Sequence, residues 1–206
     1  ELIIMLLPLL LLSAIIVPVV MHVRGKEISS KKMVSFIAAM ATLLLYLYFS
    51  FVFTLGAAYH TKSLPEKMGL DDKEVSDDEL YDTALIVLKG AQSCLDDIEF
   101  SEGGASAMPY SFSELNDKLN TSYKTVAADY DFISSMSSKV KPVIMSEPMT
   151  YTHISGVYTY FTGEANINVN FPDYSLPYTM AHEMAHQRGI AREDEANFIA
   201  YLVCIG

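Results

Sequence analysis

The sequence has few cysteines and few basic residues, and both shortages narrow the classes of protein that fit it. Two cysteines, Cys94 and Cys204, are too few for a disulfide framework, and we expect two free thiols packed in the interior. Lysine and arginine number 14 against 25 acidic residues, which gives a net charge of −11. Such a chain would repel phosphate groups, so nucleic acid is not an expected partner. Disorder of the whole chain is excluded as well, because 51% of its residues are hydrophobic.

Charged residues are absent from two long stretches near the start of the sequence, residues 2–21 and 33–59. Each reaches the roughly 18–20 residues that a helix needs to cross a bilayer core. In lipid a helix pairs all of its own backbone amides, so two membrane-spanning helices are predicted within an anchor of residues 1–60. A cleaved signal peptide followed by one span is the alternative. It is disfavoured because residues 1–21 lack a basic leader and a small-residue cleavage site.

Basic residues are concentrated between those two stretches. The loop 22–32 holds four basic residues and one acidic residue, whereas residues 61–206 hold 10 basic and 23 acidic residues. Short loops rich in lysine and arginine stay in the cytoplasm. We therefore expect a multi-pass protein of a bacterial cell membrane, with the lipid bilayer as a partner and the acidic residues 61–206 on the extracytoplasmic side.

Residues 61–206 carry the periodicities of an α+β domain. Ser76 with Glu79, and Ser111 with Glu114, have the spacing of capping boxes at helix starts. Apolar residues at steps of three and four follow each pair, which predicts two amphipathic helices packed in the core, the first over about 76–98. The second helix runs from residue 111 to about residue 130.

The remaining part of the domain alternates strand and helix patterns. Residues 139–170 alternate apolar and polar letters and are broken by glycines, which predicts a small antiparallel sheet. Ser175 and Pro177 then mark the start of a helix that Gly189 interrupts. A last helix is predicted from about Arg192 to the end, where an apolar run without a stop signal suggests that the domain is truncated.

Residues 182–186, His-Glu-Met-Ala-His, carry the chemistry. On a helix, His182 and His186 share one face and can bind one Zn²⁺, while Glu183 is placed to act on a water at the metal. Zinc lowers the pKa of such a water towards 7, and the glutamate can pass its proton to the leaving amine. The motif predicts a zinc-dependent metallopeptidase with Glu183 as general base and a peptide or protein as substrate.

A zinc hydrolase of this kind takes three protein ligands and leaves one position open, so a third ligand is needed. Glu193, Asp194 and Glu195 are the candidates. Glu193 is preferred because Glu193 and Asn197 have the spacing of the Glu-x-x-x-Asp helix of gluzincins, and an amide oxygen can still accept a hydrogen bond from a ligand imidazole. Glu195 is the runner-up. Alternatively, residues 193–195 are merely an acidic helix start that the helix dipole favours.

Other residues near the motif have less specific interpretations. His153 lies in a predicted loop, where a surface position is favoured over a place in the cleft. Five tyrosines precede the motif, and packing is their default role, although one of them is a candidate to stabilise an oxyanion: Tyr151, Tyr158, Tyr160, Tyr174 and Tyr178. The segment 156–168 is the best candidate for a sheet edge on which a substrate adds as an extra strand.

Two segments, SGVYTYFTGEANINVN and SLPYTMAHEMAHQRGIAREDEANFIAYL, resemble an uncharacterised bacterial family of predicted membrane zinc metallopeptidases. That family has two N-terminal membrane helices and an HExxHQRG-x-x-x-E-x-E-A-N signature, and the resemblance covers most of the chain, to residue 206. It implies a zincin-like fold with His182, His186 and Glu193 as zinc ligands, but no particular substrate. Two alternatives keep the zinc site: a non-catalytic envelope sensor or scaffold, and a zinc amidase acting on cell-wall peptides.

Overall fold

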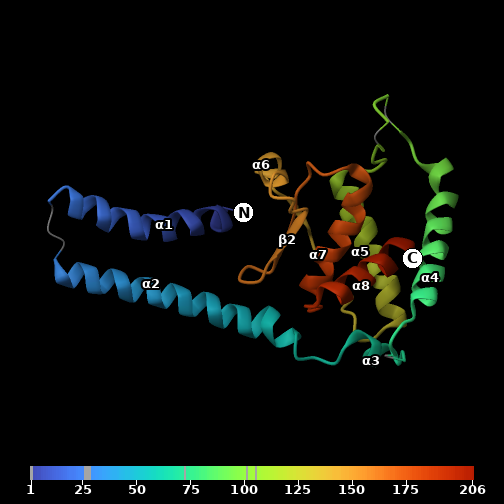
Figure 1. The fold of residues 1–206 in the computed structure, drawn as a ribbon, viewed down its shortest axis with the longest axis horizontal. Coiled ribbons are helices and arrows are strands. Elements are labelled where there is room, and N and C mark those ends of the chain that lie inside the picture. Colours follow the sequence, from blue (N-terminus) through green and yellow to red (C-terminus); the bar gives the residue numbers. More distant parts are fainter. Residues whose placement is uncertain (1, 26–28, 72, 101, 105) are drawn as a thin grey trace.

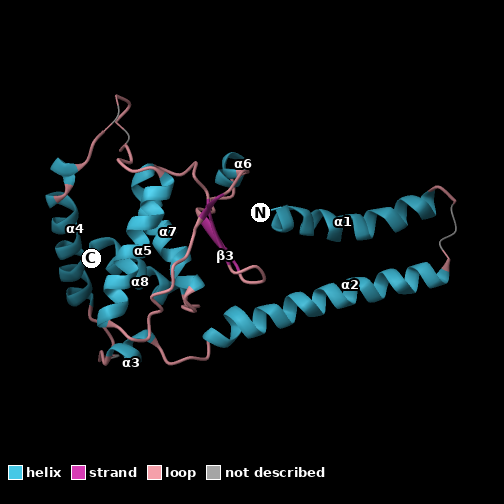
Figure 2. Ribbon diagram, turned by 180° about the vertical axis from the view of Figure 1, so that it is seen from behind, coloured by secondary structure: helices cyan, strands magenta, loops and turns pink. Residues whose placement is uncertain are grey.

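The structure, a computed structural model, describes residues 2–25, 29–71, 73–100, 102–104 and 106–206. Two long helices that run in opposite directions extend from one side of a globular part (Figure 1). These are α1 (Leu2–Val23) and α2 (Ser30–Phe51), and a π-helical turn over Val52–Gly56 continues α2. Residues 26–28 of the predicted basic loop lie outside the described residues. Figure 2 shows the globular part from behind, with its sheet at the end nearest the two long helices.

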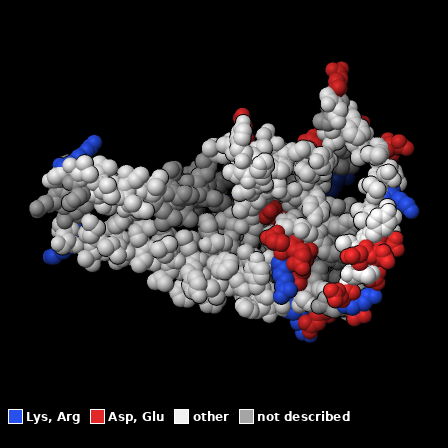
Figure 3. Space-filling model, viewed as in Figure 1, with Lys and Arg blue, Asp and Glu red and all other residues white. Residues whose placement is uncertain are grey.

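Both predicted apolar helices form, and the second is long and apolar enough to cross a membrane by length and composition. This second segment is Ser30–Gly56, with 27 residues. Among the described residues, the apolar part of the first helix, Leu12–Met21, is shorter than a membrane span. A membrane anchor and a signal sequence share this composition, so the two-span arrangement stays a prediction. Basic side chains gather at the end of the two helices furthest from the globular part, and acidic ones cover the globular part (Figure 3).

The first amphipathic helix predicted within residues 61–206 departs from its prediction in one respect. α4 (Asp77–Ser93) begins at the predicted capping box, in which Ser76 and Glu79 each accept a hydrogen bond from the other's backbone N–H. The expectation that this helix packs in the core is wrong, because none of its residues is buried and Leu80 is 64% exposed. An amphipathic period shows which face prefers burial, but it does not supply an element to cover that face. Cys94, which follows α4, and Cys204 are free as expected, yet both are exposed.

The core lies between three helices, α5 (Phe112–Asp129), α7 (Leu176–Gln187) and α8 (Glu193–Ile205). α5 starts at the second predicted capping box and buries the apolar side of its stripe, as expected. Tyr123 on this helix is fully buried, and its hydroxyl donates a 2.6 Å hydrogen bond to the carbonyl of Ala181 on α7. Burying a tyrosine with its hydroxyl paired avoids the cost of an unsatisfied polar group, so this bond fixes α7 against α5.

A three-stranded sheet packs against α7, in the order β1 (Lys141–Pro142), β3 (Glu164–Ile167), β2 (Gly156–Thr159). β2 and β3 form the antiparallel hairpin that the alternating letters predict, but β1 pairs with β3 in parallel. The prediction of a purely antiparallel sheet is therefore wrong. Parallel strands need a crossover connection, and here α6 (Ser146–Thr150) and β2 supply it. Alternation of letters reports a strand but not the direction of its partner.

Arg188, just after α7, holds the segment 134–138 against the core. Its guanidinium donates four hydrogen bonds of 2.6–3.0 Å to three carbonyl oxygens and one hydroxyl, those of Ser134, Met136, Met184 and Ser138. It also lies 3.7 Å from the centre of the Tyr123 ring. Arg188 is only 9% exposed, so its buried cation is held by these hydrogen bonds and by the contact with the Tyr123 ring.

Replacing Arg188 with methionine should lower the free energy of unfolding by about 3 kcal/mol or more, because several buried acceptors lose their donor. The matched control is Lys139→Met, which removes an exposed cation from the neighbouring segment and should cost less than about 0.5 kcal/mol. Denaturant unfolding of the detergent-solubilised chain, followed by circular dichroism, measures both. Equal stability of the two variants would contradict the role given to Arg188.

Candidate metal centre

Two histidines of α7 form one side of the centre. His182 and His186 are one helical turn apart, and their Nε2 atoms lie 3.1 Å from each other. The Nδ1 atom of His186 is 2.7 Å from the carbonyl oxygen of Ile190. Nδ1 therefore carries the ring proton, and its N–H donates a hydrogen bond to that carbonyl. This leaves the lone pair of Nε2 free to face a metal ion, which is the usual arrangement for a ligand histidine.

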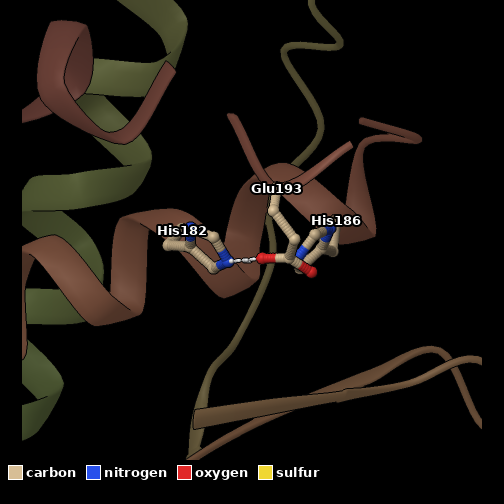
Figure 4. A group of neighbouring side chains, drawn as sticks. All are labelled: His182, His186 and Glu193. Atoms are coloured by element: carbon tan, nitrogen blue, oxygen red, sulfur yellow. Dashed lines mark hydrogen bonds and ion pairs between the residues drawn. The ribbon is translucent and has the colours of Figure 1, made fainter. Parts of the chain in front are cut away.

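Glu193, the first residue of α8, completes the centre. Gly189 adopts φ +84°, a conformation that favours glycine, and the chain turns there between α7 and α8. The Glu193 carboxylate then points between the two imidazoles (Figure 4), with oxygens 3.1 Å from His182 Nε2 and 3.5 Å from His186 Nε2. Ligands about 2.0–2.1 Å from a tetrahedral zinc ion are about 3.3 Å apart. The two Glu193 distances involve different oxygens, Oε2 near His182 and Oε1 near His186, while the two Nε2 atoms are 3.1 Å apart. One donor atom from each residue lies within 4.8 Å of the other two, which is close enough for the three to share one ion.

The electrostatics of the three side chains also suit a cation. Burial lowers the pKa of His182, and the charge of His186 lowers it further, against the opposing effect of Glu193. A neutral imidazole is the form that binds metal. The His182 and His186 side chains are 14% and 7% exposed, whereas that of Glu193 is 72% exposed. The two imidazoles are therefore buried, and the centre is open to solvent on the side of Glu193. The three side chains together could hold a metal ion.

Glu183 lies beside the three donors, in a place that Gly156 of β2 leaves open. A Cβ at residue 156 would come within 2.6 Å of Glu183 Oε1 and 2.8 Å of its Cγ, so only glycine permits this approach. Glu183 is 5% exposed, and its Oε2 has no hydrogen-bond partner among the described residues. Burial, with a smaller contribution from the charge of Glu193, raises the pKa of Glu183 to about 8. A buried carboxyl without a partner makes Glu183 a candidate functional group.

The other acidic candidates at the start of α8 point elsewhere. Glu195 is buried, and its Oε1 accepts a 2.8 Å hydrogen bond from the backbone N–H of Leu64 in α3 (Leu64–Met68). Asp194 and Glu195 line a separate pocket with Leu64 and Phe198. The runner-up Glu195 is therefore a structural anchor. Asn197, the expected partner of a ligand histidine, lines the pocket of the centre, and its side chain acts to raise the pKa of His182 against the effect of burial.

A pocket of about 440 Å³ opens over the centre. Its wall includes Gly156, Val157 and Tyr158 of β2 and, unexpectedly, Leu55 from the π-helical turn after α2. His153 lines the same pocket while its side chain is exposed, so it lies at the rim. The pocket thus combines residues of α7, α8, the sheet and the π-helical turn after α2.

The five tyrosines expected near the motif divide into three groups. Tyr158 and Tyr178 line the pocket, and burial raises the pKa of both hydroxyls. The Tyr158 ring is stacked 6.1 Å from the His186 ring, and the Tyr178 hydroxyl donates to the Asn197 carbonyl at 3.3 Å. Tyr160 packs instead on Phe51, and the side chains of Tyr151 and Tyr174 are exposed. Packing thus accounts for Tyr160, and of the five tyrosines Tyr158 and Tyr178 line the pocket.

Sequence reasoning did not identify three contributors to the site. Gly156 was taken only as a break between strands, although a glycine inside a strand often marks a close approach of this kind. The Ile190 carbonyl carries no signal in the sequence, since any residue supplies one. Leu55 was part of an apolar stretch, and nothing in that stretch distinguishes a residue that faces a pocket from one that faces lipid.

Comparison with known proteins gives a family but no function. No curated protein and no solved structure matches the chain. The model of the DUF3810 family, described as a protein of unknown function, matches residues 1–206. The expectation of an uncharacterised family is thereby confirmed, and because the match spans the whole length, the chain belongs to the DUF3810 family.

Proposed function

We propose that this protein is a membrane-anchored zinc metallopeptidase with a zincin-like catalytic domain. The observation that carries the proposal is the convergence of His182, His186 and Glu193, whose donor atoms lie within 4.8 Å of one another in the lining of the pocket. Two imidazoles and a carboxylate are also the donor set of catalytic zinc sites in which one position stays open. Glu183, unpaired and buried beside them, supplies the acid–base group.

Each side chain has a separate task in the proposed reaction. Zn²⁺ held by the three donors would supply Lewis-acid chemistry, polarising a peptide carbonyl and lowering the pKa of water. Glu183 takes a proton from the attacking water and delivers it to the leaving amine. Asn197 and the Ile190 carbonyl keep the two imidazoles oriented. Tyr158 and Tyr178 are the candidates to donate to an oxyanion.

β2 offers the substrate a free edge. In the order β1-β3-β2 it is the outer strand, and Gly156, Val157 and Tyr158 line the pocket. An extended peptide added to this edge would gain backbone hydrogen bonds and lie beside Glu183. This supports the earlier assignment of the 156–168 segment as the substrate-binding edge.

The membrane arrangement is part of the proposal. The basic residues between α1 and α2 favour a cytoplasmic loop, and both helices then cross to the other side. The acidic globular part lies at the opposite end of the two helices from those residues (Figure 3). We therefore place the metal centre outside the cytoplasm of a bacterial cell, on a chain with two spans.

Metal content tests the donor set directly. Purified protein should contain about one zinc ion per chain. His182→Ala should lose most of this zinc, because the two remaining donors bind the ion too weakly. His153→Ala is the matched control, since His153 lies at the rim of the pocket without belonging to the three donors. Inductively coupled plasma mass spectrometry measures both. Zinc that is substoichiometric in wild type and unaltered in His182→Ala would refute the centre.

Glu183→Gln separates a peptidase from a non-catalytic zinc-binding sensor or scaffold. The variant should keep its zinc, because Glu183 is not among the donors, and should lose turnover by at least about 100-fold, because the proton carrier is gone. Cleavage of a quenched-fluorescent peptide library by the purified chain measures turnover. Unchanged cleavage, or unchanged function of the variant in cells, would contradict catalysis, and activity confined to cell-wall peptides would reassign the protein as an amidase.

Gly156→Ala tests the position of the glutamate. The new Cβ would overlap Glu183 Oε1 and Cγ, so the carboxylate must move and turnover should fall at least about tenfold while zinc content stays the same. Gly90→Ala in α4 is the control, because a Cβ there meets nothing within 4 Å. The same peptide assay and zinc measurement apply. Turnover equal to wild type in Gly156→Ala would show that the close approach is not required.

A further inference from the structure

The pocket of the metal centre meets the end of the predicted membrane helix. Leu55, in the π-helical turn after α2, lines the same pocket as His182 and Glu183 and is half-buried. Phe51, one turn earlier, packs edge-on against Tyr160, with ring centres 5.5 Å apart. Tyr160 belongs to the loop that joins β2 to β3, and Figure 1 shows this loop beside the last turns of α2. The pocket and the membrane helix therefore share residues and contacts.

Helix length sets the height of the pocket relative to the bilayer. Ser30–Gly56 has 27 residues, which make a helix of about 40 Å against a hydrocarbon core of about 30 Å. Lys31 and Lys32 at its start extend into the polar boundary of one leaflet, so Leu55 falls at the headgroup level of the other. Aromatic side chains favour that level, and several occur at this end of the helix and in the hairpin loop: Phe51, Phe53, Tyr59, Tyr160 and Phe161.

β2 runs from the metal centre towards this level. Its first residue, Gly156, contacts Glu183, and its last, Thr159, leads directly into Tyr160 at the membrane helix. An extended peptide on the free edge of β2 would follow the same line. Four residues of strand cover about 13 Å, so a peptide with its scissile bond beside Glu183 would reach the headgroups within a few residues.

We infer that the substrate is a membrane-anchored polypeptide, cut in the extended segment just outside the bilayer, within about ten residues of its hydrophobic anchor. This inference rests on the proposed peptidase function and deepens it by naming the substrate class. Holding enzyme and substrate in one bilayer raises their effective concentration. A segment that leaves the membrane beside α2 is thus delivered to the free edge of β2 without first being captured from solution.

The first experiment compares protein termini in the membrane and culture supernatant of cells carrying wild type or Glu183→Gln. New termini that depend on Glu183 should fall in membrane-anchored proteins, within about ten residues of the anchor. Glu183-dependent termini that fall in soluble proteins, or far from any anchor, would overturn the inference while the peptidase function stands. Identical termini in both strains would overturn the inference and the proposed function together.

The second experiment uses purified components to measure how the distance between the cleavage site and the bilayer affects the cleavage rate. The peptide around one cleavage site is fused to a single transmembrane helix through a spacer of 5 or 25 residues, and each reporter is placed in vesicles with the full-length protein. The short spacer should be cut at least tenfold faster than the long one. Equal rates would refute the inference, and zinc content and cleavage of the free peptide report separately on the centre itself.

A matched pair of insertions removes the height constraint without touching the centre. Ten Gly/Ser residues between His60 and Thr61 separate α2 from α3, and the bond between Leu64 and Glu195 remains in place. The same insertion between Gly103 and Gly104, in an exposed loop, is the control. The first insertion should reduce the tenfold preference for the short spacer to less than threefold, with free-peptide cleavage unchanged, and the control should keep the preference. A preference unaffected by the first insertion would contradict the inference.

Discussion

The turn between α7 and α8 is the constraint on which the rest of the centre depends. Gly189 takes a conformation that favours glycine, and residues 187–192 alone separate the second histidine from the third donor. Within that turn the Ile190 carbonyl fixes the tautomer of His186, and the Arg188 guanidinium holds the segment to Tyr123. One short loop thus orients one ligand, delivers another and attaches both to the core, which is how a site stays preorganised before any ion binds.

The start of α8 shows how neighbouring acidic residues can have unrelated tasks. Successive residues of a helix point about 100° apart, so Glu193 faces the histidines while Glu195 faces the backbone N–H of Leu64 in α3. The hydrogen bond between Glu195 and Leu64 connects α8 to α3, in the segment that follows α2. Residues two apart in the sequence therefore face the candidate metal centre on one side and the segment that follows α2 on the other.

The sequence predicted those parts of the structure that local chemistry decides. Both capping boxes, the stripe of α5, the turn at Gly189 and the convergence of His182, His186 and Glu193 follow from spacing, and the structure contains them. Features that depend on distant partners were missed or wrong. The apolar stripe of α4 lacks a cover among the described residues, and β1 joined the sheet in parallel. The contact of Gly156 with Glu183 joins residues 27 positions apart, which no local pattern reports.

Leu55 in the pocket lining connects the openness of the centre to the proposed substrate class. With Glu193 largely exposed, the centre has little enclosure with which to select side chains. The proposed substrate class needs no such enclosure, because under it the substrate is selected by leaving the bilayer beside α2 with an extended segment at the level of β2. Folded soluble proteins keep their strands paired and their backbone buried, so they cannot easily occupy the same edge. On the proposed substrate class, the aromatic contact between Phe51 and Tyr160 has the role of keeping the edge of β2 close to the end of α2.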